Sequence, residues 1–350
     1  MGIIGIIANP ASGKDVRRLV ARASVFDNQE KQAIVGRALS GIRAAAGSDC
    51  RIAYFDDAHG IARGALELAG GGLEAEAVEG TGTVTALDTV HVAERLREIG
   101  CAVVITLGGD GTNRAVTTGW PDATLIPIST GTNNVFPTLV EATIAGAAAG
   151  LVAAGHVPLD EVSHISKLVR VDIDGEAADL ALIDAVLSRE RFVGSRALLS
   201  PDHLAAALLT RADPAAVGMT ALGGLIDPLG IDEDAGLLLT LGGNGARVNA
   251  PIAPGFYREV GIESCRRVAF RKRVSFEGPG VLAFDGERER VLKPGQQVRL
   301  TIDRSGPRVV DVTRTLHAAA ALGRFRTGKI PAGRRRSARP AGTKTKRTRT

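Results

Sequence analysis

The segment VVITLGGDGTN (residues 103–113) joins a short apolar run to a loop in which three glycines surround one aspartate. An apolar run of this length is typical of a parallel strand that is covered on both faces. Glycines let backbone N–H groups approach an anion without a Cβ in the way. The segment therefore predicts a phosphate site beside Asp110, at the end of a buried strand. A plain strand-to-helix turn, with Asp110 as a helix cap, fits the same residues.

Two further loops of the same kind favour the phosphate interpretation. The apolar residues 2–8 lead into NPASGK (residues 9–14), which supplies an amide, a hydroxyl, a small-residue backbone and a lysine. The spacing of its glycine to its lysine excludes a Walker loop. Residues 123–128 lead into STGTNN (residues 129–134), which supplies hydroxyls, a glycine and amides. Because doubly wound sheets bind ligands at the carboxyl ends of their strands, we expect the three loops to converge on one crevice.

At these loops the chain resembles the superfamily of NAD kinases, diacylglycerol kinases and sphingosine kinases, whose shared signature is Gly-Gly-Asp-Gly-Thr. The segments NPASGK, GGDGT and STGTNNVFP (residues 129–137) together look most like the ATP-NAD kinase-like proteins named for acetoin catabolism. The segment FDGE (residues 284–287) is similar to the Asp-Gly-Glu segment of the superfamily's C-terminal domain. The resemblance runs from Met1 to Val312 and is densest before Gly155.

The resemblance implies an enzyme that phosphorylates NAD at the 2'-hydroxyl of its adenosine ribose, with ATP and Mg²⁺. Asp110 is then the catalytic carboxylate, acting on the acceptor hydroxyl or organising magnesium. Lys14 is alternatively an exposed lysine of a first helical turn, and Asn133 and Asn134 alternatively cap a helix. The residues expected to bind phosphates and nucleotide are Asn9, Ser12, Gly13, Lys14, Gly108, Gly109, Gly111, Thr112, Asn113, Thr130, Gly131, Thr132, Asn133 and Asn134.

The acceptor side matches the family less well. Ile183 and Asp184 stand where NAD kinases have an Asn-Glu pair that holds the nicotinamide nucleotide, so the pair is incomplete. Asp184, Asp285 and Glu287 are expected to bind the acceptor. Asp184 is alternatively a strand residue that faces solvent, and Asp-Gly followed by charged residues is also an ordinary hairpin tip. The segment GMTALGG (residues 218–224) loosely resembles the family's glycine-containing nucleotide loop. The altered motifs keep two alternatives open: a kinase for another small polyol or lipid-like alcohol, and a non-catalytic nucleotide-sensing regulator.

Alternating strands and helices predict an α/β fold, with a Rossmann-like parallel-sheet N-terminal domain followed by a mostly antiparallel β-sandwich domain. We expect a nucleotide-binding domain over residues 1–155 and a β-rich acceptor domain over 156–313. Residues 314–332 are expected to form a returning helix and linker, and 333–350 a disordered basic tail. Within the second domain, residues 180–188 read as one strand. The turns DGE (174–176) and DRSG (303–306) are both expected to close hairpins.

Composition narrows the function classes. The net charge of +5 misleads, because residues 324–350 hold 11 Lys and Arg and no acid, which leaves 32 bases against 38 acids for the rest. Such a tail is a solvated segment or a nucleic-acid-binding arm. Few aromatic residues argue against base stacking elsewhere, and three distant cysteines argue against disulfides or zinc. No apolar run has the length of a signal peptide or a membrane span, so we expect a cytoplasmic protein without a membrane partner. We also expect the protein to form a homo-oligomer.

Overall fold

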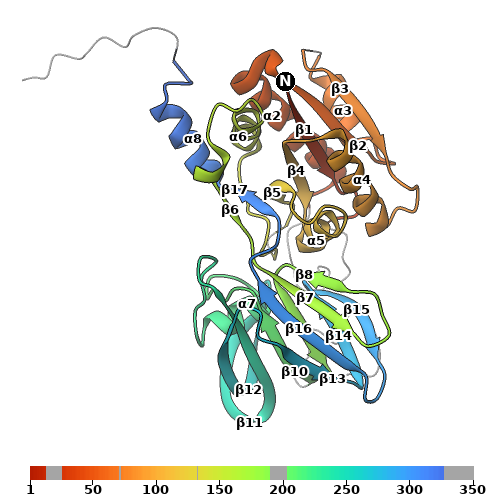
Figure 1. Ribbon diagram of the computed structural model, residues 1–350, viewed down its shortest axis with the longest axis vertical. Helices are drawn as coiled ribbons and strands as arrows, with labels where there is room; N and C mark the ends of the chain where they lie inside the picture. Colours follow the sequence, from red (N-terminus) through yellow and green to blue (C-terminus); the bar gives the residue numbers. More distant parts are fainter. Residues whose placement is uncertain (13–25, 71, 132, 190–202, 327–350) are drawn as a thin grey trace, which may run out of the picture.

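The computed structural model describes residues 1–12, 26–70, 72–131, 133–189 and 203–326, which form two domains (Figure 1). Several predictions lie outside the described residues: those for Gly13, Lys14 and Thr132, and that of the basic tail. Among the described helices, none is long and apolar enough to cross a membrane.

The first domain is built on a seven-stranded sheet with the order β3-β2-β1-β4-β5-β17-β6. Its first five strands in this order are parallel, as the alternating pattern predicts. Their carboxyl ends therefore meet at one edge, where the three glycine-containing loops begin. The strands are β1 (Gly2–Ala8), β2 (Cys50–Asp56), β3 (Ala75–Glu79), β4 (Val103–Gly108), β5 (Thr124–Ser129), β6 (Ser163–Ile165) and β17 (Arg308–Val310).

Helices cover both faces of this sheet. One face packs against α2 (Asn28–Ala46), α3 (Ile61–Leu68) and α6 (Ala142–Ala153), and the other against α4 (Ala86–Ile99) and α5 (Asp110–Gly119). Helix α2 was not predicted. It lies against α6 so closely that a Cβ on Gly41 would be 1.9 Å from the Thr143 carbonyl oxygen. The buried face of α2 combines an apolar stripe at helical spacing, Ile34, Val35, Ala38, Leu39 and Ile42, with Gly41 at the closest approach.

The second domain is a sandwich of two antiparallel sheets, so the predicted fold class is confirmed. The six-stranded sheet has the order β12-β11-β10-β9-β14-β15 and the four-stranded sheet β13-β16-β7-β8, with an apolar core between them. The strands are β7 (Leu168–Ile173), β8 (Asp179–Ala181), β9 (Asp184–Ser188), β10 (Leu204–Leu209), β11 (Ala235–Ala253), β12 (Phe256–Ala269), β13 (Val274–Glu277), β14 (Gly280–Phe284), β15 (Glu287–Leu292) and β16 (Gln297–Asp303). A short helix, α7 (Met219–Gly224), packs on the six-stranded sheet.

Two local expectations differ from the structure. Residues 180–188 form two strands, β8 and β9, in different sheets, because the intervening Leu182 and Ile183 donate their N–H groups to the Asp285 carboxylate instead of a strand. The turn at 303–306 closes no hairpin, since β16 stays in the sandwich whereas β17 pairs with β5 and β6 of the first domain.

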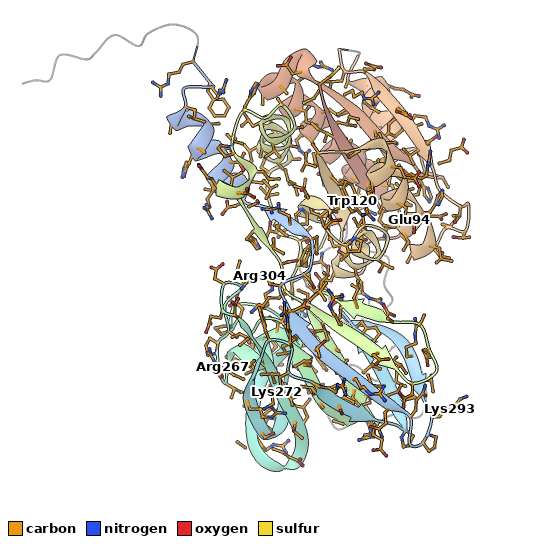
Figure 2. All side chains as sticks on the ribbon, in the orientation of Figure 1. Glu94, Trp120, Arg267, Lys272, Lys293 and Arg304 are labelled. Atoms are coloured by element: carbon orange, nitrogen blue, oxygen red, sulfur yellow. The ribbon has the colours of Figure 1, made fainter. Side chains whose placement is uncertain are left out.

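The chain crosses between the domains at other points than expected. Strand β6 still belongs to the first sheet, so the crossing follows Ile165 rather than residue 155, and the return begins at Arg308. Helix α8 (Val312–Ala321) then packs beside α6. Arg304 lies at the junction between the domains (Figure 2), where its guanidinium donates to the carbonyl oxygens of Ile165 and Ile231 and to Asp234.

Candidate active site

A cavity of about 630 Å³ lies where the carboxyl ends of the first sheet face the sandwich. Both domains line it, so it is the crevice that the three loops predict at this edge. From the first domain come Asn9 to Ser12, Phe55 to Ala58, Glu79, Gly80, Gly82, Val84 to Ala86, Asp88, Thr89, Gly109 to Thr112, Ala115 and Asn133 to Val135. From the second domain come Ile183, Asp184, Val186, Leu204, Val217 to Thr220, Ile252 to Pro254, Ala283, Asp285 and Gly286.

Hydrogen bonds tie the three predicted loops together. The Asn9 carboxamide donates to Thr112 Oγ1 at 2.8 Å and accepts from the Ala11 N–H at 2.9 Å. The Thr130 hydroxyl donates to Ser12 Oγ at 3.1 Å. Each loop therefore contributes polar groups to one end of the cavity, which we call the donor end.

The Gly-Gly-Asp-Gly loop needs its glycines for close approach. A Cβ on Gly108 would lie 2.4 Å from Thr112 Oγ1, and one on Gly109 would lie 2.8 Å from Asn134 Oδ1. Helix α5 starts directly after Gly109, so its first N–H groups and its dipole face the cavity. The Asp110 carboxylate accepts from the N–H groups of Val135 at 3.0 Å and Phe136 at 2.7 Å, which holds it at the cavity wall.

Some residues expected to bind phosphate lie behind this wall. Asn113 is fully buried, where it accepts from the Thr106 hydroxyl at 2.7 Å and donates to the Gly109 carbonyl oxygen at 2.9 Å. Gly108, Thr130 and Gly131 are likewise absent from the described lining. These four residues shape the loops, because their polar groups are engaged within the protein and do not reach the cavity.

Lys31 of α2 supports the donor end and gave no signal in the sequence. Its side chain is fully buried, and its ammonium donates to the carbonyl oxygens of Asn9 at 2.9 Å, Pro10 at 3.3 Å and Ser12 at 2.8 Å. A buried ammonium needs hydrogen-bond acceptors, and these bonds hold the backbone of residues 9–12 in place. A lysine on a helix is normally solvated, so only the packing of α2 reveals this role.

The loop between β3 and α4 also reaches the cavity. Asp88 accepts from the Thr81 hydroxyl at 2.6 Å and the Thr83 N–H at 3.3 Å. Burial acts to raise the pKa of Asp88, but these hydrogen bonds outweigh it and lower the pKa. Asp88 is therefore a charged group that organises a loop of threonines and glycines at the cavity edge.

Two buried carboxyl groups mark the opposite, acceptor end. Asp285 lies at the β14–β15 hairpin tip with φ of 50°, and it accepts from the N–H groups of Leu182 at 2.9 Å and Ile183 at 2.7 Å. The segment is thus a hairpin tip, and Asp285 in it lines the cavity. Glu287 begins β15, but its side chain is not among those described.

Asp184 is the unusual member of the pair, because its Oδ1 is buried without a hydrogen-bond partner among the described residues. Burial, followed by the charges of Asp285 and Asp110, raises the pKa of Asp184 to about 8. Burial also raises the pKa of Asp285 to about 7, against the backbone N–H groups that favour its charged form. The acceptor end therefore retains a proton on its carboxyl groups near neutral pH.

Two arginines lie close to these carboxyl groups without lining the cavity. Arg114 donates to Asp179 at 2.8 Å and to the Leu180 carbonyl oxygen at 2.7 Å. Arg211 has Nε and Nη2 buried without partners among the described residues. Burial lowers the pKa of Arg211, while the nearby charge of Asp110 opposes this. Arg211 is a buried cation behind the carboxylates, and the sequence gave no sign of it.

A divalent metal fits the donor end only in company with a ligand. In the described part of the chain, no three His, Cys, Asp or Glu side chains gather as a ready-made metal site. Asn133 Oδ1, however, is a buried oxygen without a partner among these residues, and it lines the cavity as Asp110 does. Magnesium commonly takes one or two protein oxygens and completes its shell with phosphate and water. Asp110 and Asn133 suit that arrangement.

Comparisons with known proteins match both domains. Residues 4–157 match the family model of the ATP-NAD kinase N-terminal domain, and residues 167–305 that of the acetoin catabolism protein X C-terminal domain. Acetoin catabolism protein X of Cupriavidus necator is 35% identical over 332 residues, covering 91% of this chain and 92% of that protein.

Solved structures with a similar arrangement include two kinases. Yeast NADH kinase complexed with NADH aligns with a TM-score of 0.48 and 14% identity, over 95% of this chain and 90% of the other. A putative diacylglycerol kinase from Bacillus anthracis str. Sterne aligns with a TM-score of 0.45 and 12% identity, over 88% of this chain and 96% of the other.

Proposed function

The chain belongs to the acetoin catabolism protein X family and carries an ATP-NAD kinase N-terminal domain, and from this premise we propose that it transfers a phosphoryl group from ATP to an alcohol. The observation that carries the proposal is the placement of Asp110. It lies between the anion-binding start of α5 and the buried carboxyl groups of the second domain. That is where a donor phosphate and an acceptor hydroxyl would meet.

The donor end would hold the triphosphate mainly through the backbone. The N–H groups at the start of α5, together with Thr112 and the Asn9 loop, offer hydrogen bonds to phosphate oxygens. Lys31 keeps the Asn9 loop in place from below. This preorganisation is the main contribution a protein makes to phosphoryl transfer, since the reaction needs in-line placement more than covalent help.

Transfer itself requires a group for the proton of the acceptor. The bond between the γ-phosphorus and the oxygen bridging it to the β-phosphorus breaks, and a bond forms from the γ-phosphorus to the acceptor oxygen. The hydroxyl proton passes to the Asp110 carboxylate, and ADP leaves. Asp110 is suited to this role because two backbone N–H groups fix it and α5 begins at it.

Asp110 and Asn133 are the residues that would hold magnesium against the phosphates. Bound there, the ion would neutralise phosphate charge in a cavity that is rich in carboxylates. We therefore expect the reaction to depend on a divalent cation.

NAD is the acceptor that the N-terminal family match suggests, with NADP as product. The case for NAD would rest on Asp184, which takes the place of the acidic member of the family's Asn-Glu pair, and the case against it on Ile183, which replaces the asparagine. The acceptor is tested by incubating the purified chain with ATP and MgCl₂ and a panel containing NAD, polyols and aliphatic alcohols. Products are identified by mass and ADP is measured in parallel. Absence of any phosphorylated product would contradict the phosphotransferase and favour a nucleotide-sensing regulator.

A further inference from the structure

The acceptor end of the cavity has a chemical character of its own. We propose that the acceptor is an uncharged alcohol with a compact aliphatic body and no phosphate or carboxylate group. This inference rests on the proposed phosphotransferase function and specifies its substrate class. Three independent features of the described residues support it: an apolar wall, two unsatisfied polar atoms, and an excess of carboxyl groups.

The apolar wall comes from three parts of the second domain. Val186 of β9 and Ala283 of β14 are paired across the sheet, and Leu204 at the start of β10 lies beside them. The end of β11 and the turn after it contribute Ile252 and the following residues, and the start of α7 contributes Met219. Val186, Leu204 and Ala283 are all at most 5% exposed and belong to one apolar cluster. A ligand that occupies this space must bury apolar surface there to bind well.

Side-chain alternation places the reacting end directly beside this wall. Asp184 and Val186 are two residues apart on β9, and Ala283 of β14 pairs with Val186, while Asp285 follows β14 at the hairpin tip. Residues two apart point to the same face of a sheet. The carboxyl groups therefore lie at the top of the surface whose lower part is aliphatic, so a hydroxyl at one end of an aliphatic molecule would meet them.

Two buried polar atoms at this end still need a partner. Asp184 Oδ1 and Thr220 Oγ1 have no hydrogen bond among the described residues, although their residues are only 8% and 1% exposed and both line the cavity. Buried polar atoms are nearly always hydrogen-bonded in native proteins. A ligand hydroxyl, which donates once and accepts twice, can satisfy a carboxyl oxygen and a threonine hydroxyl together.

The charges around the cavity disfavour an anionic acceptor. Seven carboxyl groups line it, and no lysine, arginine or histidine does so among the described residues. Five of the seven, Asp56, Asp57, Glu79, Asp88 and Asp110, come from the first domain, and the two at the acceptor end are Asp184 and Asp285. At the acceptor end, burial raises the pKa of Asp184 to about 8 and the pKa of Asp285 to about 7, so this end already disfavours negative charge. A pyrophosphate placed there would add negative charge at short range in a poorly hydrated space.

Ile183 is a further feature that suits an aliphatic ligand better than a dinucleotide. It is 3% exposed and lines the cavity at the position where the resembled NAD kinases carry an asparagine. An aliphatic side chain offers no hydrogen bond to a nucleotide, whereas it suits an aliphatic ligand. Ile183 therefore adds to the apolar character of the wall that Val186 and Leu204 form.

The test uses the full chain with ATP and MgCl₂ and three acceptor sets: 1,2-alkanediols of four to eight carbons, NAD, and glycerol 3-phosphate. We expect kcat/KM to rise along the diol series by up to about fourfold for each added methylene until the wall is covered. NAD and glycerol 3-phosphate should give no phosphorylated product. NADP formation, preference for glycerol 3-phosphate, or indifference to chain length would overturn the inference while leaving the phosphotransferase standing. No product with any acceptor would contradict the phosphotransferase itself.

Two variants locate the effect in this wall. Ile252→Asn should lower kcat/KM for the longest diol at least fivefold and flatten the dependence on chain length, with the KM for ATP unchanged within twofold. Tyr257→Asn, at an exposed position on the same hairpin that does not line the cavity, is the matched control. Thr220→Val keeps the shape but removes the hydroxyl, and should lower kcat/KM for every diol about tenfold. Equal activity of Thr220→Val and the parent chain would refute the assigned hydrogen bond.

Discussion

The two ends of the cavity are built in different ways. At the donor end, each loop is a continuous stretch of sequence after a parallel strand, and backbone N–H groups and small polar side chains do the binding. At the acceptor end, the wall comes from segments near residues 184, 204, 218, 252 and 284, which only the folded sandwich brings together. The donor end is therefore fixed by local sequence, whereas the acceptor end can change its chemistry by single substitutions on a constant scaffold.

The sharpest way to test this division is to remove the group between the two ends. Asp110→Asn keeps the size of the side chain and an oxygen that can accept from Val135 and Phe136, but it loses the charge. Turnover should fall at least ~10²-fold while ATP binding and the melting temperature stay near the parent values. Steady-state kinetics, calorimetry with ATP and thermal unfolding measure the three quantities. Asp172→Asn, on an exposed strand of the second domain, is the control. Full turnover of the Asp110 variant would remove the catalytic assignment.

The acceptor end is tested by Asp184→Ala. Removing the carboxyl group leaves a buried ligand hydroxyl without its partner, which costs about 1 to 3 kcal/mol, so the KM for the acceptor should rise between about fivefold and 150-fold. The KM for ATP should change little, because Asp184 lies on the other domain. Asp184→Asn, which retains hydrogen bonding, should lose less. If both KM values rose together in Asp184→Ala, the two ends would not be separable.

The corresponding test of the donor end is Lys31→Met. Removing the ammonium leaves three buried carbonyl oxygens of the Asn9 loop without their donor, so the KM for ATP should rise about tenfold. The acceptor KM should stay the same. The first domain should also lose about 3 kcal/mol of unfolding free energy. Lys31→Arg keeps the positive charge but changes the hydrogen-bond geometry, so it distinguishes the effect of the charge from that of the geometry. We expect it to recover part of the ATP affinity that Lys31→Met loses. A variant that lost stability but kept its KM for ATP would show that Lys31 only stabilises the fold.

What the sequence could predict follows the same division. The parallel sheet, the three loops and Asp110 could be found because strand, glycine turn and polar group follow one another directly. Helix α2 was missed although Ile34, Val35, Ala38, Leu39 and Ile42 repeat at helical spacing. The buried Lys31 could not be predicted, because a lysine on a helix is normally solvated. The break between β8 and β9 also escaped prediction, since it depends on the Asp285 carboxylate, which is about a hundred residues away. Tertiary contacts, rather than local propensity, decide these features.

The raised pKa of Asp184 gives a smaller effect that also distinguishes the two ends. In the unfolded chain the Asp184 carboxyl group releases its proton near its ordinary pKa of 3.8. In the folded protein its pKa is about 8, so the group stays protonated up to about that pH. The folded state therefore binds more protons between these values, and the unfolding free energy should fall as pH rises, by up to about 1.4 kcal/mol per pH unit. Urea unfolding at pH 5, 6 and 7 should show a shallower decline for Asp184→Asn. An identical slope would mean that Asp184 is charged in the folded protein.

The smallest expected effect concerns the basic tail, which lies outside the described residues. Removing the tail tests whether residues outside the described lining also contribute to the donor end. The described lining of the cavity contains seven carboxyl groups and no cation, whereas residues 334–350 hold eight Lys and Arg. If the tail supplied cations to the donor end, truncation after Gly333 would raise the KM for ATP, and added salt would do the same to the full chain. We expect neither change, because the only apolar residues of the tail, Ala338, Pro340 and Ala341, are too few and too small for the tail to dock. The melting temperature should likewise stay within about one degree. Loss of salt-sensitive nucleic-acid binding on truncation, with kinetics unchanged, would instead assign the tail a separate role and leave the division between donor and acceptor ends intact.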